Sequence, residues 1–456
     1  MGRVSKYQYT HFIYPFVVDS KKYNSFINKT ISDEKKWSFK IYDQSVDYDV
    51  HSFFLPYMKN FLFQSLFWTK NEQKTFKDLN ITQKMSKLSK MPCLTFDYNL
   101  GKIKTGNVTI KDEESINFEI SQIRLVTFEP GICFLDIKTE IDTCGKYIDF
   151  DTILDFNFGF RELTPRGDNR VSIKKLKANK IDNIMDIATF ISSITEGFET
   201  QNIEKVYYDK MFTYSYVCLD RSEWEEESDF KEIENDFYKF QYVLEGKSQS
   251  RFNNECEKLK ANRYSRWQYS MFGFSNESGV VLVSEKEQYN ITKMPQYFDN
   301  VYIFMLLLAL YQRISLLNFS HELLNSSKSR VTTMQNRLTE FVHFSWFSQI
   351  TNSEYGMDIW KKWQEALGLP ELFDEVHKEY QEYYENIVSE GQNGINVVLM
   401  IVYIISTIFA GLSILVNKID IQGTWMEYGL YIALITAIVC YPTYLIFKII
   451  NRKKRR

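Results

Sequence analysis

The feature that most constrains this chain is an uncharged segment close to its C-terminal end. No charged residue occurs from Gly391 to Asn417, and most side chains there are aliphatic. A helix needs roughly 20 apolar residues to cross the hydrocarbon core of a membrane, which is about 30 Å thick. The segment therefore predicts a membrane-spanning helix at about residues 394–417.

A second uncharged segment, at 428–447, follows a short connection and predicts a second span. The tail at 451–456 is basic, and basic clusters beside a span stay on the cytoplasmic side. Because two spans return the chain to its starting side, the N-terminal part is expected in the cytoplasm too. Its first 19 residues are too polar for a signal peptide. The sequence thus predicts a transmembrane hairpin at 391–450 in the inner (plasma) membrane, with both termini cytoplasmic.

The part of the chain before the hairpin predicts an α/β fold followed by helices. Strand-like runs occur at 11–18 and 205–220, two more flank a Pro130-Gly131 turn within 120–141, and 179–197 has helical spacing. We predict a cytoplasmic α/β ligand-sensing domain at 1–295 and a helical region and stalk at 296–390. The apolar run at 301–311 is too short for a span and predicts a buried helix. Residues 371–417 predict one helix of roughly 70 Å.

Composition and motifs argue against several classes of function. The net charge of −3 disfavours direct nucleic-acid binding. The segment 101–108 has P-loop glycines, but Asn107 and Val108 replace the required Lys and Ser/Thr, and 321–325 has Asn325 in place of the second His of a zinc protease. The six cysteines show no C-x-x-C spacing. We predict no catalytic residue and no enzyme activity. No cofactor is firmly implied by the sequence, a divalent cation as the transported ion and a nucleotide ligand stay open, and any metal site is unknown.

Polar and small side chains recur along one face of the first predicted span. Their steps of three and four residues place them on a single side of a helix. Small and hydroxyl residues also favour close packing between membrane helices, whereas carboxamides at both ends of a span need water or a partner. The face is therefore either a helix–helix seam or the lining of a cation pore. We call it the candidate pore face: Asn396, Leu399, Tyr403, Ser406, Ala410, Ser413 and Asn417.

The helix that leads into this span is acidic. Residues 371–390 contain seven Asp or Glu residues and one Lys. In a ring of copies these carboxylates would concentrate cations at a pore mouth, and in a single chain they are an ordinary solvated face. An apolar seam that includes Phe373, Val376 and Tyr380 on the same helix indicates packing against neighbours.

This order of a cytoplasmic α/β part, a long helix, two C-terminal spans and a basic tail resembles the CorA family of divalent-metal transporters. The resemblance implies a homopentamer whose first span lines the pore and which contacts membrane lipid. That family carries Gly-Met-Asn at the outer end of the first span, where this chain has "AGLSILVN" at 410–417. The missing triad leaves the architecture in place and removes the expectation of selective Mg²⁺ uptake.

The chain is most similar to the CorA-like membrane effectors of type III CRISPR systems, on the enlarged N-terminal part, the helical stretch 302–319 and the degenerate triad. That resemblance implies a channel opened in antiviral defence by a small nucleotide messenger, such as a conjugate of S-adenosylmethionine and AMP, which would disrupt membrane integrity or ion balance. The alternatives are a constitutive transporter of divalent cations (Mg, Co or Zn) and a membrane-anchored sensor that conducts nothing.

A nucleotide ligand needs cations for its phosphates and planar side chains for its base. The loop 161–170 carries three arginines, and the segment 262–270 alternates arginines with aromatic residues, so guanidinium groups could hold phosphate and rings could stack on a base. Asp220, at the end of a strand-like run, could accept from an amino group. The alternative is that each segment is an ordinary solvated loop or strand. The candidate ligand-binding residues are Arg161, Arg166, Arg170, Asp220, Arg263, Tyr264, Arg266 and Trp267.

Overall fold

The computed structural model describes residues 3–100, 105–110, 114–142, 148–163, 172–173, 187–195, 200–201, 210–249, 260–324 and 331–418. The chain forms two compact units. The first comprises Met1–Asn325 with Asn336–Val376, and the second comprises Ser326–Gln335 with His377–Arg456. Residue 295, the predicted domain boundary, lies within the first unit. The second predicted span, the loop before it and the basic tail lie outside the described residues.

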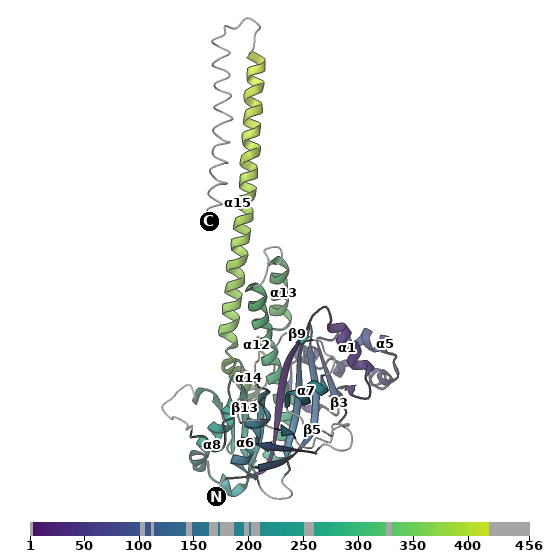
Figure 1. Cartoon of the computed structure of the whole chain (residues 1–456), viewed down its shortest axis with the longest axis vertical. Coiled ribbons are helices and arrows are strands. Elements are labelled where there is room, and N and C mark those ends of the chain that lie inside the picture. The colour runs from purple at the N-terminus through teal and green to yellow at the C-terminus, as the bar shows by residue number, and fades with distance from the viewer. Residues whose placement is uncertain are drawn as a thin grey trace. The chain divides into compact units, whose positions relative to one another are not determined.

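A large β-sheet forms the centre of the first unit, which confirms the predicted α/β character of this part (Figure 1). β10 and β13 pair in parallel and the other neighbours are antiparallel. The strands along the sheet are, in spatial order, β11 (Arg263–Tyr264), β12 (Ser270–Phe274), β13 (Ser278–Ser284), β10 (Phe212–Leu219), β1 (Val4–Val18), β6 (Ile132–Ile141), β5 (Glu114–Phe128), β3 (Cys93–Tyr98) and β2 (Trp37–Phe39); β4 (Thr105–Ile110), β7 (Ile148–Asp149), β8 (Ser172–Ile173) and β9 (Thr200–Gln201) pair beside this path.

Both faces of the sheet are buried. Successive side chains of a strand point to opposite sides, so each face packs against its own set of helices. On one face, Phe12 of β1 contacts Phe156 and Phe160 of α6 (Phe150–Phe160). The helices α1 (Tyr23–Ser32) and α8 (Phe230–Tyr242) contribute to the same apolar cluster. The β5–β6 hairpin turns at 129–131, as the Pro-Gly motif predicted.

The other face of the sheet is covered by a chain segment that starts with a π-helical turn, η6 (Phe298–Tyr302), and continues as α12 (Ile303–Leu324). Phe298 packs against Tyr9 of β1 and Tyr214 of β10. Within the described residues, one helix, Met294–Leu323, is long and apolar enough to cross a membrane, and 83% of its most apolar window is buried inside the protein. The run at 301–311 is therefore a buried helix, as its length predicted.

An ionic network joins this helical segment to the middle of the sheet. Asp136 accepts from Arg124 Nε at 3.0 Å and Nη2 at 2.7 Å, and its other oxygen lies 2.7 Å from His11 Nδ1. Asp299 of η6 faces His11 Nε2 at 3.0 Å and accepts from Lys138 at 2.7 Å. Both ring nitrogens of His11 thus face carboxylate oxygens.

The charges of this network determine how Asp136 titrates. Burial by itself raises the pKa of the Asp136 carboxyl, but His11 and Arg124 outweigh burial and lower that pKa to about 2. For Asp299, burial likewise opposes ionisation, and the His11 and Lys138 contacts lower its pKa. The network is therefore a buried set of mutually compensating charges that fixes η6 on strands β1, β5 and β6.

The remaining helices are short and connect or cover these elements. They are α2 (Tyr48–Phe53), α3 (Pro56–Leu62), η1 (Gln64–Phe67), α4 (Lys70–Thr75), η2 (Phe76–Asp78), α5 (Ile81–Leu88), α7 (Ile187–Ile194), η4 (Arg221–Glu223), η5 (Glu227–Asp229), α10 (Tyr289–Thr292), α11 (Met294–Tyr297), α13 (Val331–Phe344) and α14 (Glu354–Ala366). The predicted helix at 179–197 appears as α7, and residues 179–186 and 196–197 lie outside the described residues.

The last described element is α15 (Leu369–Lys418), one continuous helix of 50 residues (Figure 1). It begins just before Pro370, whose fixed φ suits the first turn of a helix. At about 1.5 Å per residue it is roughly 75 Å long. The prediction of a single helix from the acidic segment through the first uncharged segment is confirmed.

Candidate functional site

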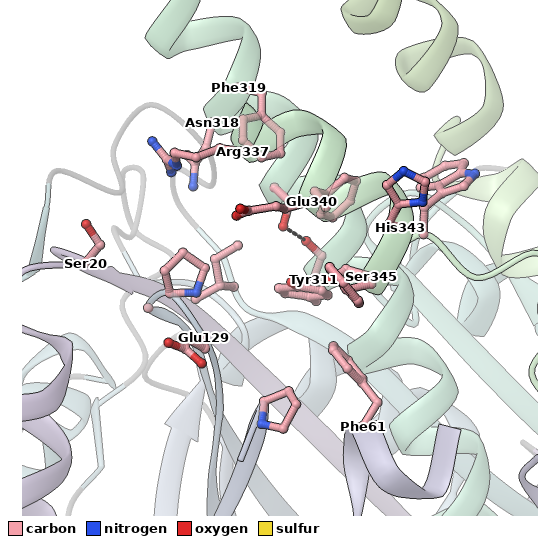
Figure 2. Close-up of a pocket in the computed structure, with 18 of the residues that line it drawn as sticks. Ser20, Phe61, Glu129, Tyr311, Asn318, Phe319, Arg337, Glu340, His343 and Ser345 are labelled. Atoms are coloured by element: carbon pink, nitrogen blue, oxygen red, sulfur yellow. Dashed lines mark hydrogen bonds between the residues drawn. The ribbon is translucent and has the colours of Figure 1, made fainter. Parts of the chain in front are cut away.

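The first unit contains a pocket of about 950 Å³, which we call the large pocket. It is bounded by the end of β1, by α3, by the β5–β6 turn, by α12, and by α13 with the segment that follows it (Figure 2). This volume lies within the range of about 300–1,000 Å³ that is typical of small-molecule sites. The pocket is therefore the candidate ligand site of this unit.

Aromatic side chains form most of the apolar wall of this pocket. Tyr311 of α12 stacks on Phe128 with ring centroids 4.5 Å apart, and it lies 6.2 Å from Phe341 of α13. Phe319 lies 5.5 Å from Phe341. Such rings offer flat faces on which a planar ligand can stack. The full set of aromatic lining residues is Tyr57, Phe61, Tyr311, Phe319, Phe341, Phe344, Trp346 and Phe347.

Local hydrogen bonds hold this wall in place. The Tyr311 hydroxyl donates to Ser345 Oγ at 3.1 Å, and the Gln312 side-chain amide donates to the Ser345 carbonyl at 2.9 Å. The backbone N–H of Trp346 donates to the Phe341 carbonyl at 3.0 Å. Burial raises the pKa of the Tyr311 phenol to about 12, so this hydroxyl stays protonated and continues to donate.

The polar lining of the pocket contains three glutamates, one arginine and two histidines beside serine and asparagine side chains. Arg337 of α13 forms an ion pair of 2.6 Å with Glu322 of α12. Within the described residues, Glu129 and Glu340, which also line the pocket, form no ion pair. Figure 2 shows Glu340 extending from α13 on one side of the pocket and Glu129 on the opposite side. The lining therefore offers two carboxylates to donor groups and one guanidinium that is already paired.

Arg161, the first predicted ligand residue, lies at the end of α6 and is only 4% exposed. Its Nε lies 3.7 Å from Glu162, and Nε and Nη1 form no hydrogen bond among the described residues. Burial lowers the pKa of its guanidinium. Arg166 and Arg170 lie outside the described residues, so the predicted phosphate-binding loop stays a prediction.

The second predicted segment lies at the β11 edge of the sheet. Arg263 pairs with Glu234 of α8 at 2.6 Å, and Arg266 pairs with Glu354 of α14 at 3.0 Å. Burial lowers the pKa of the Arg263 guanidinium. These two arginines thus have carboxylate partners within the fold, and a phosphate would have to compete with them.

The other predicted residues also have partners in the fold. Trp267 packs against Tyr355 with ring centroids 5.1 Å apart. Burial raises the pKa of the Tyr264 phenol to about 12. Asp220 accepts from Ser222 N at 3.0 Å as the N-cap of η4. None of these predicted residues lines the large pocket.

The candidate pore face lies on α15. Tyr403 is 73% exposed and Leu399 is 59% exposed in the single chain, and the Ser406 hydroxyl donates to the Val402 carbonyl at 2.8 Å. Because this hydroxyl is satisfied within its own helix, either a packed or a water-lined environment is compatible with it. The side chains of Asn396, Ala410, Ser413 and Asn417 lie outside the described residues.

Sequence reasoning did not find the large pocket. Its lining comes from six separate stretches of the chain, and none of them forms a recognisable motif. The feature of the sequence that could have indicated the pocket is the aromatic cluster at 341–347, which follows a helical pattern. Within the described residues, no group of three or more His, Cys, Asp or Glu residues could hold a metal ion.

Comparisons with models of protein families, with curated proteins and with solved structures find no match for this chain.

Proposed function

We propose that this chain is a CorA-like membrane channel effector that assembles as a homopentamer and is opened by a small nucleotide messenger in type III CRISPR antiviral defence. The observation that carries the proposal is the continuity of α15. A single helix runs from the first unit through an acidic segment into the uncharged segment 394–417. A helix of this kind can transmit a displacement at its first turns to a membrane span.

The pocket of the first unit supports the ligand-sensing part of the proposal. Its volume of about 950 Å³ and its aromatic wall suit the base of a nucleotide. The exposed Tyr403 and Leu399 on α15 support the membrane part, because apolar side chains exposed on a single chain need lipid or another copy to cover them.

The proposal is tested by reconstitution of the full chain into liposomes that contain an ion-sensitive dye. The conjugate of S-adenosylmethionine and AMP is then added on the side of the large N-terminal part. We expect ion flux that depends on the conjugate, and a detergent-solubilised mass about five times the 54.3 kDa of one chain.

A variant in the candidate pore face provides the control for flux. Ser406→Trp is expected to abolish flux without changing the oligomer, since it adds bulk to a position that the proposal places in the pore. Divalent-cation flux without any messenger would support the constitutive transporter instead. A monodisperse monomer in lipid nanodiscs that conducts nothing under any condition would support the anchored sensor and refute the channel.

A further inference from the structure

The polar lining of the large pocket distinguishes between the parts of a nucleotide. Among the described residues, its acidic side chains are Glu129, Glu322 and Glu340, its histidines are His321 and His343, and its arginine is Arg337, which is paired with Glu322. A phosphate that entered would meet repulsion from Glu129 and Glu340, whose carboxylates form no ion pair among the described residues. An amino group on a planar ring would instead donate to a carboxylate oxygen, which can only accept when ionised.

One wall of the same pocket is connected to the start of α15. Trp346 lines the pocket and stacks on Phe373 with ring centroids 4.4 Å apart and an angle of 18° between the ring planes. Phe373 itself does not line the pocket and lies in the second turn of α15. Trp346 therefore contacts both the cavity and this helix.

The backbone at Trp346 is held by hydrogen bonds, and its ring is held by aromatic contacts. The Trp346 and Ser345 N–H groups both donate to the Phe341 carbonyl, at 3.0 and 2.8 Å, and Ser345 is held by Tyr311. The indole ring has Phe341 at 6.3 Å and Phe373 at 4.4 Å as its ring neighbours. A planar group that enters the pocket therefore acts on the Trp346 ring, and through it on Phe373, without needing to move the backbone.

From these contacts we propose that the pocket binds an amino-bearing planar heterocycle, such as an adenine ring, and that the Trp346–Phe373 stack transmits its binding to α15. The coupling part rests on the proposed channel function, and the binding part does not. The ring stacks on the aromatic wall, its amino group donates to Glu340 or Glu129, and any phosphates attached to it lie outside the pocket. The ligand-bound and empty states then differ in the position of the Trp346 ring against the Phe373 ring.

Binding is tested by calorimetric titration of the solubilised full chain with three probes: adenosine, purine riboside, which lacks the amino group, and ribose 5-phosphate, which lacks the base. We expect adenosine to bind at least tenfold more tightly than purine riboside, and ribose 5-phosphate not to bind. Replacing both Glu129 and Glu340 with Gln should reduce that preference to less than threefold. Equal binding of all three probes, or no binding of adenosine at low millimolar concentration, overturns the site assignment.

Coupling is tested with Phe373→Ala in the liposome assay with the conjugate of S-adenosylmethionine and AMP. Because Phe373 does not line the pocket, we expect adenosine affinity within threefold of wild type and loss of at least 90% of the ligand-stimulated flux. Phe67→Ala, which truncates an exposed ring outside the pocket, should change neither quantity. If Phe373→Ala keeps the stimulated flux, the stack does not couple the pocket to α15. If adenosine binds but wild type conducts nothing, the channel proposal and the coupling fail and the site stands.

Discussion

Removing the charge of Asp136 should be among the most destabilising single substitutions in the first unit. Asp136 is 1% exposed and accepts two hydrogen bonds from Arg124, at 3.0 and 2.7 Å, while its other oxygen lies 2.7 Å from His11. Asp136→Asn keeps the shape of the side chain but leaves the buried Arg124 guanidinium without a carboxylate. Breaking a buried ion pair on one side costs about 3–5 kcal/mol.

The assay is thermal unfolding of the solubilised full chain, followed by intrinsic fluorescence. For a unit of this size, each kcal/mol shifts the midpoint by about 2 °C, so Asp136→Asn should lower it by roughly 5–10 °C. The matched control is Asp78→Asn at the exposed end of η2, which should shift the midpoint by about 1 °C or less. An Asp136→Asn midpoint within about 1 °C of wild type would refute the view that this network stabilises η6 on the sheet.

Three further predictions follow from the described residues. The pKa of the Asp136 carboxyl is lowered from its ordinary value of 3.8 to about 2. The ionised carboxylate therefore adds about 2 kcal/mol to the free energy of unfolding, which is fully present above about pH 4 and is lost as the pH falls through about 2. Acid unfolding of Asp136→Asn should lack this contribution. Gly131→Ala should lower the free energy of unfolding by about 2–4 kcal/mol in a denaturant titration, since φ is +136° and a Cβ would lie 2.2 Å from the Val18 carbonyl oxygen. Gly368→Ala, at φ +63° in open space, should cost only about 1 kcal/mol in the same titration. If the proposed channel forms, cysteine at position 403 should react with a water-soluble thiol reagent in the presence of the messenger, and cysteine at position 401 should not. Equal reactivity would make the candidate pore face a packing seam.

The local sequence pattern correctly predicted those helices and strands that a short stretch of residues is enough to specify. The two strands around Pro130-Gly131, the buried helix at 301–311 and the single helix through 371–417 are all present. Each has a cause that acts over a few residues: a turn motif, a run too short to cross a membrane, or a helical pattern with proline only in the first turn. Such causes can be seen in one sequence.

The candidate site could not be predicted in the same way, because its residues meet only through the fold. Arginines 161, 263 and 266 have the right chemistry for phosphate, yet in the structure they face Glu162, Glu234 and Glu354. Their carboxylate partners are one to 88 residues away in the chain. Nothing in the local sequence shows that a guanidinium will be used inside the fold rather than offered to a ligand.

The two ends of the strand order have a consequence for how copies of this chain can meet. The sheet ends in β11, with two residues, and in β2, with three residues. An edge strand this short presents few unpaired backbone groups, which is a common way in which proteins prevent a sheet from adding strands of another molecule. Association of these copies by strand addition at either end is therefore disfavoured. High local concentrations of the chain should accordingly not seed cross-β aggregates from these edges.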